Sequence, residues 1–497
     1  MNLANQLVIN YNNRPNKICL IQNNKKITYE VLYKKVSNFK KYIEQKGIKK
    51  GDKVLVLTPM SIDLYVTLLS VWAIGATVCF MDAGFIKNGM KKNEFDDINA
   101  VIGISKYILY SNINKNLRGL RIKINTSIIE KLHEDNKLEI QEVDKDFSAI
   151  MTYTSGTTGK PKIAARSHEF LECQANILQK HLKYESYDIE LSSIPIFTLS
   201  NIDIGITTVI ANANFSNLGS SNSRKLITQI IDNKINRLMA APGVLNLIIS
   251  FCLKYDITLN NIKKIFTGGG AIFLDFIENL KKVFPNAKIY TLYGSTEAEP
   301  IAELDIDEMT FKDYEYTKKG KGILAGNIIG VDDCKIIKTG KDEIGSITEE
   351  EFKNMQTDEV GEIVVTGSNV LKGYVNGIGD KENKFKVNDI IYHRTGDLGL
   401  IDENNKLWLR GRIKEPYFNI EACLHAKLKI GKTAIFKFNE KLILVLEKSD
   451  LNTEEEIKNA VSFEKIDEIK YVKKIPVDKR HSTKVDYKEL KRILGME

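Results

Sequence analysis

The nine residues Thr154-Ser-Gly-Thr-Thr-Gly-Lys-Pro-Lys162 carry the strongest chemical signal in the chain. Two glycines let the backbone approach a ligand closely, and the hydroxyl and main-chain N–H groups around them form a nest for an anion. Lys160 adds a point charge. The segment therefore predicts a phosphate-binding loop. It is not a Walker A loop, because only two residues separate Gly156 from Gly159 and a proline follows the lysine. The alternative for such a string is a flexible surface turn.

Further segments, most of which contain glycine together with polar or charged residues, lie elsewhere in the chain. They are Leu69-Ser-Val-Trp-Ala-Ile-Gly-Ala76, Phe266-Thr-Gly-Gly-Gly-Ala271, Tyr293-Gly-Ser-Thr-Glu297, Gly361-Glu-Ile-Val-Val-Thr-Gly367, Tyr392-His-Arg-Thr-Gly-Asp-Leu398, Gly411-Arg412 and Ser482-Thr-Lys484. One such segment could arise by chance, whereas an ordered set of this length is very improbable.

In this order the segments resemble the motifs of the AMP-forming adenylating superfamily, which includes acyl-CoA synthetases, luciferases and the adenylation domains of peptide synthetases. The resemblance covers nearly the whole chain. It implies an ATP-dependent enzyme that converts a carboxylic acid, such as a fatty or other acyl acid, to acyl-AMP and pyrophosphate. ATP and Mg²⁺ are the implied cofactors, and CoA or a phosphopantetheine carrier protein is the implied thiol acceptor.

The resemblance also implies a role for individual residues. Lys484 is the implied catalytic lysine, which bridges the substrate carboxylate and the α-phosphate. Thr296 hydrogen-bonds the α-phosphate, and Glu297 coordinates Mg²⁺, a cation that prefers carboxylate oxygen. Asp397 accepts from the ribose hydroxyls and Arg412 donates to the ribose. The remaining implied ATP-binding residues are Thr154, Ser155, Gly156, Thr157, Thr158, Gly159 and Lys160 for the phosphates, Gly269, Gly270, Ala271 and Tyr293 for adenine, and Gly294 and Ser295 beside them.

Each of these assignments has a simpler alternative. A single lysine near the end of a lysine-rich chain is ordinarily a solvated surface charge. An acid such as Glu297 can instead stand at a helix N-terminus, where the helix dipole favours it. His168 follows the phosphate loop and is expected to help hold it, whereas His393 and His481 are expected to be structural or solvent-facing.

The sequence departs from the resemblance at two places. The predicted substrate pocket contains Phe197, Thr198 and Asn201, and Thr198 stands where many acyl-CoA synthetases have histidine. The stretch after the implied hinge, Lys414, is short, so a hairpin that lines the thiol tunnel in many thioester-forming relatives is expected to be compressed or lost.

Several alternatives for the reaction stay open. Residues 475–484 resemble the terminal motif of olefin-pathway β-lactone synthetases, which act on β-hydroxy acids and need no external thiol. An amino acid is another possible substrate, because Asp203 could pair with an amino group, although a structural role for this acid is the simpler interpretation. A nucleotide-binding relative that has lost catalysis and serves as a regulatory or carrier-docking module is the third alternative.

Composition limits the class of protein. With 43% hydrophobic and 27% charged residues the chain is an ordinary globular protein, and its formal charge of +8 is spread without a basic arm, so no nucleic-acid partner is expected. The six cysteines form no CxxC pair, which indicates reduced, mostly buried thiols. No signal peptide is seen, and the apolar stretch Leu68–Met81 is shorter than the roughly 20 residues of a membrane span. We therefore expect a cytoplasmic protein.

The pattern of apolar residues predicts the elements that position these motifs. Helical and strand-like segments alternate up to Leu292, which indicates an α/β fold with parallel sheets. Residues 330–410 alternate between turn signals and predict a β-rich subdomain. The segment after Lys414 predicts a small α+β module. We expect a large N-terminal adenylating domain, residues 1–413, and a small mobile C-terminal domain, residues 414–497, that carries Lys484.

Overall fold

A computed structural model describes residues 2–81, 97–134, 136–154, 162–213, 221–340, 343–428, 430–448, 452–477 and 485–496. The chain divides into two compact units, each of which is described by itself. Unit 1 comprises Met1–Ala211 and Leu371–Glu382, and unit 2 comprises Asn212–Val370 and Asn383–Glu497. The division into domains of residues 1–413 and 414–497 stays a prediction.

Unit 1 is built from strands and helices that alternate along most of its length. The helices are α1 (Asn5–Asn13), α2 (Tyr29–Gln45), α3 (Ile62–Ala73), α5 (Ser105–Ile113), α6 (His168–His181) and α7 (Pro195–Ile204). The strands are β1 (Ile18–Gln22), β2 (Lys25–Thr28), β3 (Lys53–Leu57), β4 (Thr77–Met81), β5 (Ala100–Gly103), β6 (Ile122–Asn125), β7 (Ser148–Thr154), β8 (Lys162–Ser167), β9 (Ile189–Ser192) and β10 (Thr207–Ile210).

Helix α2 shows why the sequence pattern predicted this part of the fold. The Thr28 hydroxyl accepts a hydrogen bond from the Val31 N–H and caps the helix, as expected. The residues predicted to form one apolar face, Leu32, Val36, Phe39 and Ile43, are all fully buried. Spacing of three or four residues places them on the same side of the helix, so burial of this face fixes α2 against the core.

The strand pairing of unit 1 confirms the predicted parallel α/β arrangement. One sheet has the order β6-β5-β3-β4-β7-β8, with parallel neighbours except at β8, which runs antiparallel to β7. Strands β9, β10 and β1 are parallel neighbours, and β2 completes this group as an antiparallel hairpin partner of β1. In the sequence, the predicted phosphate loop connects β7 to β8, which is the antiparallel strand pair of this sheet.

Unit 2 begins with further β–α alternation and then becomes rich in antiparallel strands. Its helices are α8 (Ser221–Asp232), α9 (Pro242–Lys254), α10 (Leu274–Val283), α11 (Phe311–Lys318), α12 (Glu349–Met355), α13 (Asp380–Asn383, whose first residues fall in unit 1), α14 (Phe418–Lys427), α15 (Glu454–Ala460) and α16 (Tyr487–Ile493). Its strands are β11 (Arg237–Met239), β12 (Lys264–Gly268), β13 (Lys288–Ser295), β14 (Ala298–Asp305), β15 (Ile323–Ile328), β16 (Asp333–Ile337), β17 (Ser346–Ile347), β18 (Gly361–Thr366), β19 (Lys384–Val387), β20 (Ile390–Ile401), β21 (Lys406–Arg412), β22 (Thr433–Phe438), β23 (Lys441–Glu447) and β24 (Glu468–Val472).

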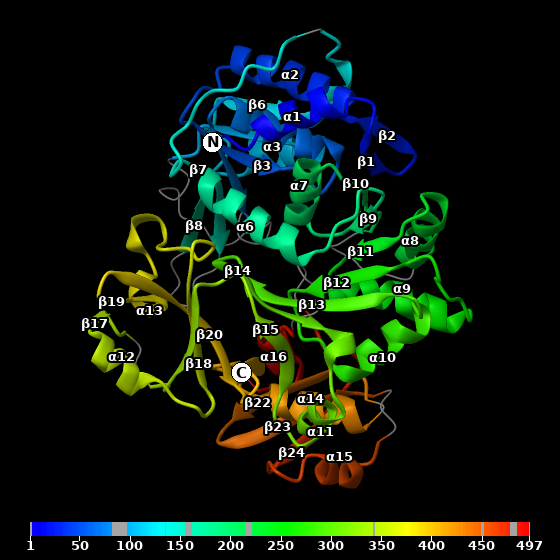
Figure 1. The fold of residues 1–497 in the computed structure, drawn as a ribbon, viewed down its shortest axis with the longest axis vertical. Helices are drawn as coiled ribbons and strands as arrows, with labels where there is room; N and C mark the ends of the chain where they lie inside the picture. The colour runs from blue at the N-terminus through cyan, green and yellow to red at the C-terminus, as the bar shows by residue number, and fades with distance from the viewer. Residues whose placement is uncertain are drawn as a thin grey trace. The chain divides into compact units, whose positions relative to one another are not determined.

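The sheets of unit 2 confirm two further predictions. Strands β11, β12 and β13 are parallel, whereas β14, β15, β21, β20, β18 and β16 follow as antiparallel neighbours, which is the predicted β-rich region. The last part of the chain forms the sheet β22-β23-β24, and α14, α15 and α16 lie beside it, in orange to red in Figure 1. This is the predicted α+β module.

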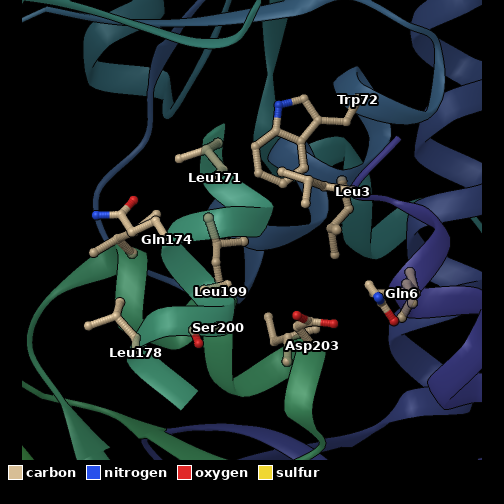
Figure 2. A pocket seen from close by; sticks show the side chains of 14 residues that line it. Leu3, Gln6, Trp72, Leu171, Gln174, Leu178, Leu199, Ser200 and Asp203 are labelled. Carbon is tan, nitrogen blue, oxygen red and sulfur yellow. The ribbon is translucent and has the colours of Figure 1, made fainter. Parts of the chain in front are cut away.

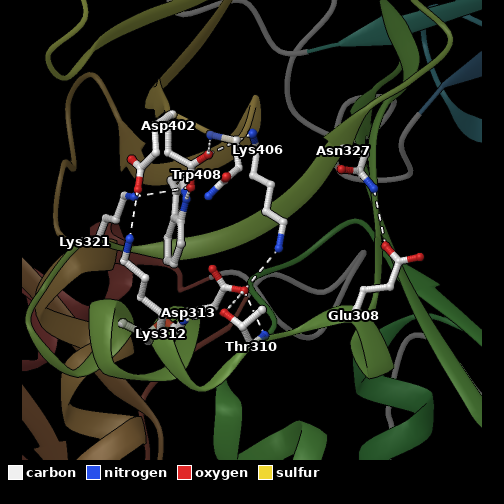
Figure 3. Close-up of polar contacts among 12 residues, drawn as sticks. Glu308, Thr310, Lys312, Asp313, Lys321, Asn327, Asp402, Lys406 and Trp408 are labelled. Atoms are coloured by element: carbon white, nitrogen blue, oxygen red, sulfur yellow. Dashed lines mark hydrogen bonds and ion pairs between the residues drawn. The ribbon is translucent and has the colours of Figure 1, made fainter.

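Strand β21 is anchored by a group of polar contacts (Figure 3). The Asp402 carboxylate, only 2% exposed, accepts from the Trp408 indole N–H at 2.8 Å and pairs with the Lys321 ammonium at 3.3 Å. The Lys321 Nζ also lies 4.6 Å from the centre of the Trp408 ring. Lys406, at the start of the strand, donates to Asp313 of α11 at 3.1 Å. These buried contacts fix the strand that ends in Arg412.

The described residues also bear on compartment and membrane association. None of the helices within the described ranges is long and apolar enough to cross a bilayer. All six cysteines are free, and all but Cys173 are buried, as expected for reduced thiols.

Candidate active site

The carboxyl ends of β12 and β13 bring two of the predicted motifs to one edge of the sheet in unit 2. The two strands are parallel and pair Gly268 with Leu292. The glycine turn that starts at Gly269 therefore leaves the sheet beside Tyr293. In open α/β sheets, ligands bind outside the carboxyl ends of parallel strands, so this edge is where a ligand is expected.

The glycine turn has the geometry of an open slot. Gly269 has a φ of +79°, a conformation that L-residues with a side chain rarely adopt, and no atom lies within 4 Å of the place where its Cβ would stand. At the preceding Gly268 a Cβ would instead collide with the Leu292 carbonyl oxygen. Gly268 thus allows tight strand packing and Gly269 allows an exposed turn. Gly270 and Ala271, both half-buried, complete the turn; their contact with adenine stays a prediction.

Asp397 is the centre of a second cluster at the site. It lies on β20 directly opposite Arg412 on β21, and the Arg412 Nε is 2.9 Å from one carboxylate oxygen. The Tyr293 hydroxyl donates to the other oxygen at 2.8 Å. Burial, and then the negative charge of Asp397, hold the pKa of Tyr293 well above its usual value. The tyrosine therefore stays protonated and keeps donating to Asp397.

A buried ion pair between β20 and β18 lies close to Asp397. The Nε and Nη2 atoms of Arg394 donate to Glu362 Oε2 at 2.9 and 2.6 Å. The next residue, Thr395, donates through its hydroxyl to the Ile363 carbonyl at 2.9 Å and accepts from the Asp397 N–H at 3.1 Å. These contacts fix β20 against β18 next to Asp397, which helps to hold its carboxylate in one orientation.

Glu297 lies in the tight turn between β13 and β14, where Ser295 pairs with Ala298. Its N–H donates to the Ser295 hydroxyl at 3.2 Å, and the residue is half-buried, as are Gly294 and Thr296. The alternative of an acid at a helix N-terminus is wrong, because a strand follows. Within the described ranges no three His, Cys, Asp or Glu residues gather as a metal site. A single carboxylate still fits Mg²⁺, which commonly takes one or two carboxylates and fills its other positions with phosphate and water oxygens.

The implied hinge lies in a short turn after β21. Arg412 and Glu415 exchange backbone hydrogen bonds of 3.1 and 2.9 Å, and Lys414 between them is exposed. The chain then enters α14 at Phe418. The hairpin that many thioester-forming relatives carry at this point is therefore absent from the described residues 413–417, as predicted.

The predicted substrate-pocket residues belong to unit 1 and are buried there. Phe197 is 2% exposed, and Thr198 and Asn201 are fully buried on α7. The Asn201 amide donates to Glu190 of β9 at 2.6 Å and to Thr208 of β10 at 2.9 Å. Their contact with a substrate stays a prediction.

Several predicted residues lie outside the description. Thr154 ends β7, and only its backbone is described. The rest of the phosphate loop, Ser155, Gly156, Thr157, Thr158, Gly159 and Lys160, and the catalytic candidate Lys484 fall outside the described residues, as does His481. Their roles stay predictions.

Histidines beside the motifs have structural surroundings. His168, the first residue of α6, is fully buried, accepts from the Leu3 N–H at 3.2 Å and packs edge-on against Trp72. Burial lowers the pKa of His168 to about 4, so it is neutral at pH 7. His393 is 3% exposed, and its Nδ1 lies 3.1 Å from the Asn383 carbonyl oxygen. This confirms the structural interpretation of His393.

Sequence reasoning missed two parts of this site. It assigned Tyr293 to adenine without its hydrogen bond to Asp397, a residue 104 positions away. It also passed over the pair of Glu362 and Arg394. A signal was present at Glu362, a charged residue directly before the apolar run Ile363–Val365 of β18.

Comparison with known proteins agrees with this geometry. Residues 8–375 match the AMP-binding enzyme family. Over 386 residues the chain is 22% identical to the olefin beta-lactone synthetase of Stenotrophomonas maltophilia (74% of this chain, 68% of that protein), and over 402 residues it is 27% identical to the 2-succinylbenzoate–CoA ligase of a Geobacillus species (80% and 75%).

Solved structures share the fold. The O-succinylbenzoate coenzyme A synthetase of Bacillus subtilis in complex with AMP superposes with a TM-score of 0.75 at 18% identity, covering 98% of both chains. The same enzyme was also solved in complex with ATP and a magnesium ion, with a TM-score of 0.73 at 18% identity, covering 98% of this chain and 99% of that one. By the match of its residues 8–375, the chain belongs to the family of AMP-binding enzymes.

Proposed function

We propose that this AMP-binding enzyme is an AMP-forming ligase that activates a carboxylic acid with ATP and then passes the acyl group to a thiol, either CoA or the pantetheine of a carrier protein. The observation that carries the proposal is the cluster of Asp397, Arg412 and Tyr293 beside an open glycine turn. A carboxylate held by an arginine and a tyrosine suits the two hydroxyls of a ribose, and the turn leaves room for a flat base. CoA ligases among the relatives support the thiol as acceptor.

The first half-reaction joins two anions. A substrate carboxylate oxygen attacks the α-phosphorus of ATP, the bond from that phosphorus to the bridging oxygen breaks, and pyrophosphate leaves. Lys160 and Lys484 would neutralise charge on the phosphates and on the developing carboxyl–phosphate bond, an effect on the order of 3 kcal/mol for one such group. Magnesium held by Glu297 would supply further neutralisation when bound.

The second half-reaction transfers the acyl group. The thiol sulfur attacks the acyl carbonyl carbon, the thiol proton is lost, and the bond to AMP breaks. The exposed turn around Lys414 is the proposed hinge for the small C-terminal domain between the two steps.

β-Lactone formation is the second candidate. Two observations favour it: the olefin beta-lactone synthetases among the relatives, and the direct passage from β21 to α14 without a hairpin. In this reaction the substrate's own β-hydroxyl oxygen attacks the acyl carbon, loses its proton and displaces AMP, so no thiol is consumed.

A panel of acids separates the candidates. Pyrophosphate release is measured with ATP, Mg²⁺ and fatty, aromatic, β-hydroxy and amino acids, each with and without CoA, and the products are identified by mass spectrometry. Thioester formation that requires CoA supports the first candidate and excludes the second. AMP release with a lactone in the absence of thiol supports the second.

One variant tests the chemistry itself. Lys484→Ala is expected to lower carboxylate-dependent ATP–pyrophosphate exchange by about 100-fold while ATP still binds. Wild-type exchange in this variant would contradict the role of Lys484. No exchange with any acid in the unmodified protein would instead favour a nucleotide-binding relative that has lost catalysis.

The state of the cysteines supports a proposal for the cellular compartment. Six free cysteines, five of them buried, suit a reducing compartment, and a cytoplasmic location is proposed on that basis.

A further inference from the structure

A cavity lies among four helices of unit 1: α1, α3, α6 and α7 (Figure 2). Its volume is about 50 Å³. Large apolar side chains form most of its wall, including Trp72 from α3, Leu171 and Leu178 from α6, and Leu199 from α7. A water molecule in such a space would find few polar partners, so an apolar chain fits the cavity better than solvent does.

Two polar side chains of α7 interrupt this wall. Ser200 is 5% exposed, and its hydroxyl has no hydrogen-bond partner within the described part of the chain. Asp203 lies one turn further along the helix, and Figure 2 shows its carboxylate on the side of the cavity that Gln6 of α1 lines. A buried hydroxyl without a partner is unfavourable, which points to a ligand that hydrogen-bonds it.

The Asp203 carboxylate lacks a matching cation. Among the described residues its side-chain partner is the Gln179 amide, at a long 3.4 Å, and no lysine or arginine pairs with it there. Burial, with a smaller contribution from Glu172, raises the pKa of Asp203 to about 6, so the group is still ionised at pH 8. A largely buried negative charge beside an apolar cavity favours a ligand that carries a positive charge.

The cavity is separate from the predicted substrate-pocket residues. Asn201 is turned toward β9 and β10, where it bonds Glu190 and Thr208. Phe197, Thr198 and Asn201 are all absent from the cavity wall, which takes the residues on the other side of α7. One face of α7 therefore packs against β9 and β10, and another face lines this cavity.

We propose that the cavity is a second small-molecule site, distinct from the predicted substrate pocket, that binds a short aliphatic primary amine. The hydrocarbon chain, of about two or three carbons for a cavity about a third of the size that holds benzene, packs among the leucines. The ammonium group donates to the Asp203 carboxylate and to the Ser200 hydroxyl. An acid of the same length places its carboxylate against Asp203 and is repelled.

Three ligands of equal length test the charge preference. Propylamine, propan-1-ol and propanoate are titrated into the full-length protein at pH 8 and followed by calorimetry and ligand-observed NMR. We expect propylamine to bind about tenfold more tightly than the alcohol, because a charge-assisted hydrogen bond is stronger than a neutral one, and propanoate to bind most weakly. Equal binding of the amine and the alcohol would overturn the proposed chemistry.

Two variants locate the site. Asp203→Asn should lower the affinity for propylamine about tenfold, to that of the alcohol, and leave the affinity for the alcohol unchanged. Asp144→Asn, an exposed aspartate of the same unit, is the matched control and should change nothing. Ala175→Phe places a ring in the cavity and should abolish binding of both ligands; undiminished binding would show that the amine binds elsewhere.

The pH dependence of the unmodified protein needs no variant. Lowering the pH from 8 to 5 protonates Asp203 but leaves the amine charged, so the affinity for propylamine should fall about tenfold while that for the alcohol stays constant. Besides Ser200 and Gln6 of the cavity wall, the described polar or charged groups near Asp203 include Glu172 and Gln179 of α6, Asn10 of α1, Arg14 after it, and Tyr29 of α2. A fall that persists in Asp203→Asn would assign the effect to one of these and refute the proposal.

Discussion

Two carboxylate–arginine pairs stand close together in unit 2 and differ mainly in their exposure to water. Glu362 and Arg394 have side chains that are 2% and 9% exposed, whereas Asp397 and Arg412 are 17% and 53% exposed. Their shortest contacts are similar, 2.6 and 2.9 Å. Contact distance therefore does not separate the structural pair from the pair that we propose binds ATP. The buried pair is shielded from water and from ligands, so its two residues keep each other as partners. The more exposed Asp397 is accessible, so a ligand hydroxyl can replace one of its hydrogen-bond partners within the protein.

The largest effect is expected when the buried pair is broken. Glu362→Ala leaves the Arg394 guanidinium without its counter-charge in a buried position, which should lower the free energy of unfolding by about 3–5 kcal/mol. Urea unfolding monitored by tryptophan fluorescence and circular dichroism measures the change. Asp397→Asn is the matched control at the exposed pair. A change below about 1 kcal/mol in Glu362→Ala would show that the buried pair does not hold the fold.

Glu421 adds to the comparison a buried carboxyl group whose side chain is hydrogen-bonded to a threonine and not to an arginine. Glu421 of α14 is 8% exposed, and its side chain accepts from the Thr433 hydroxyl at 3.0 Å. Burial raises its pKa to about 7. The folded state then binds a proton more tightly than the unfolded state, so stability falls as the pH rises from about 4.5 to about 7.

Glu421→Gln removes this titration. The variant should be more stable than the unmodified protein at pH 8, by on the order of 3 kcal/mol, and the two should converge near pH 4. Thermal unfolding across that pH range tests the sign. Equal pH profiles for both proteins would mean that Glu421 gains compensating interactions when ionised.

The exposed pair should matter for binding and little for stability. Asp397→Asn is expected to lower kcat/KM for ATP by about 30- to 100-fold, equivalent to about 2–3 kcal/mol for a hydrogen bond to a charged group. The midpoint of unfolding should stay near that of the unmodified protein, because exposed ion pairs add little. A large loss of stability with unchanged ATP kinetics would reverse the roles assigned to the two pairs.

The smallest effect is expected at a fully exposed pair. Lys312 and Glu403 lie 3.2 Å apart with side chains that are 63% and 60% exposed. Lys312→Ala should leave both the unfolding midpoint and the ATP kinetics unchanged, because water and salt screen such a pair. Lys321→Ala, at the largely buried neighbouring contact with Asp402 in Figure 3, should by contrast lower the midpoint measurably.

Much of the local structure follows from sequence alone. The cap at Thr28, the buried face of α2 and the alternation of strands and helices are all recovered, because each depends on residues within a few positions of one another. The glycine turn at Gly269 follows a predicted strand for the same reason. Family membership was also available from the order of the motifs.

The sequence by itself thus determined the fold class, the order of its elements and the residue types at the site. Only the tertiary structure decided which of them meet: Tyr293 and Asp397 across 104 residues, Arg394 on Glu362, and a neutral His168 against Trp72. The physical reason is that hydrogen bonds and pKa values depend on burial and on neighbours from distant strands, and spacing along the chain records neither. Asp203 shows this most clearly, since its charge state and its cavity exist only once four helices have packed.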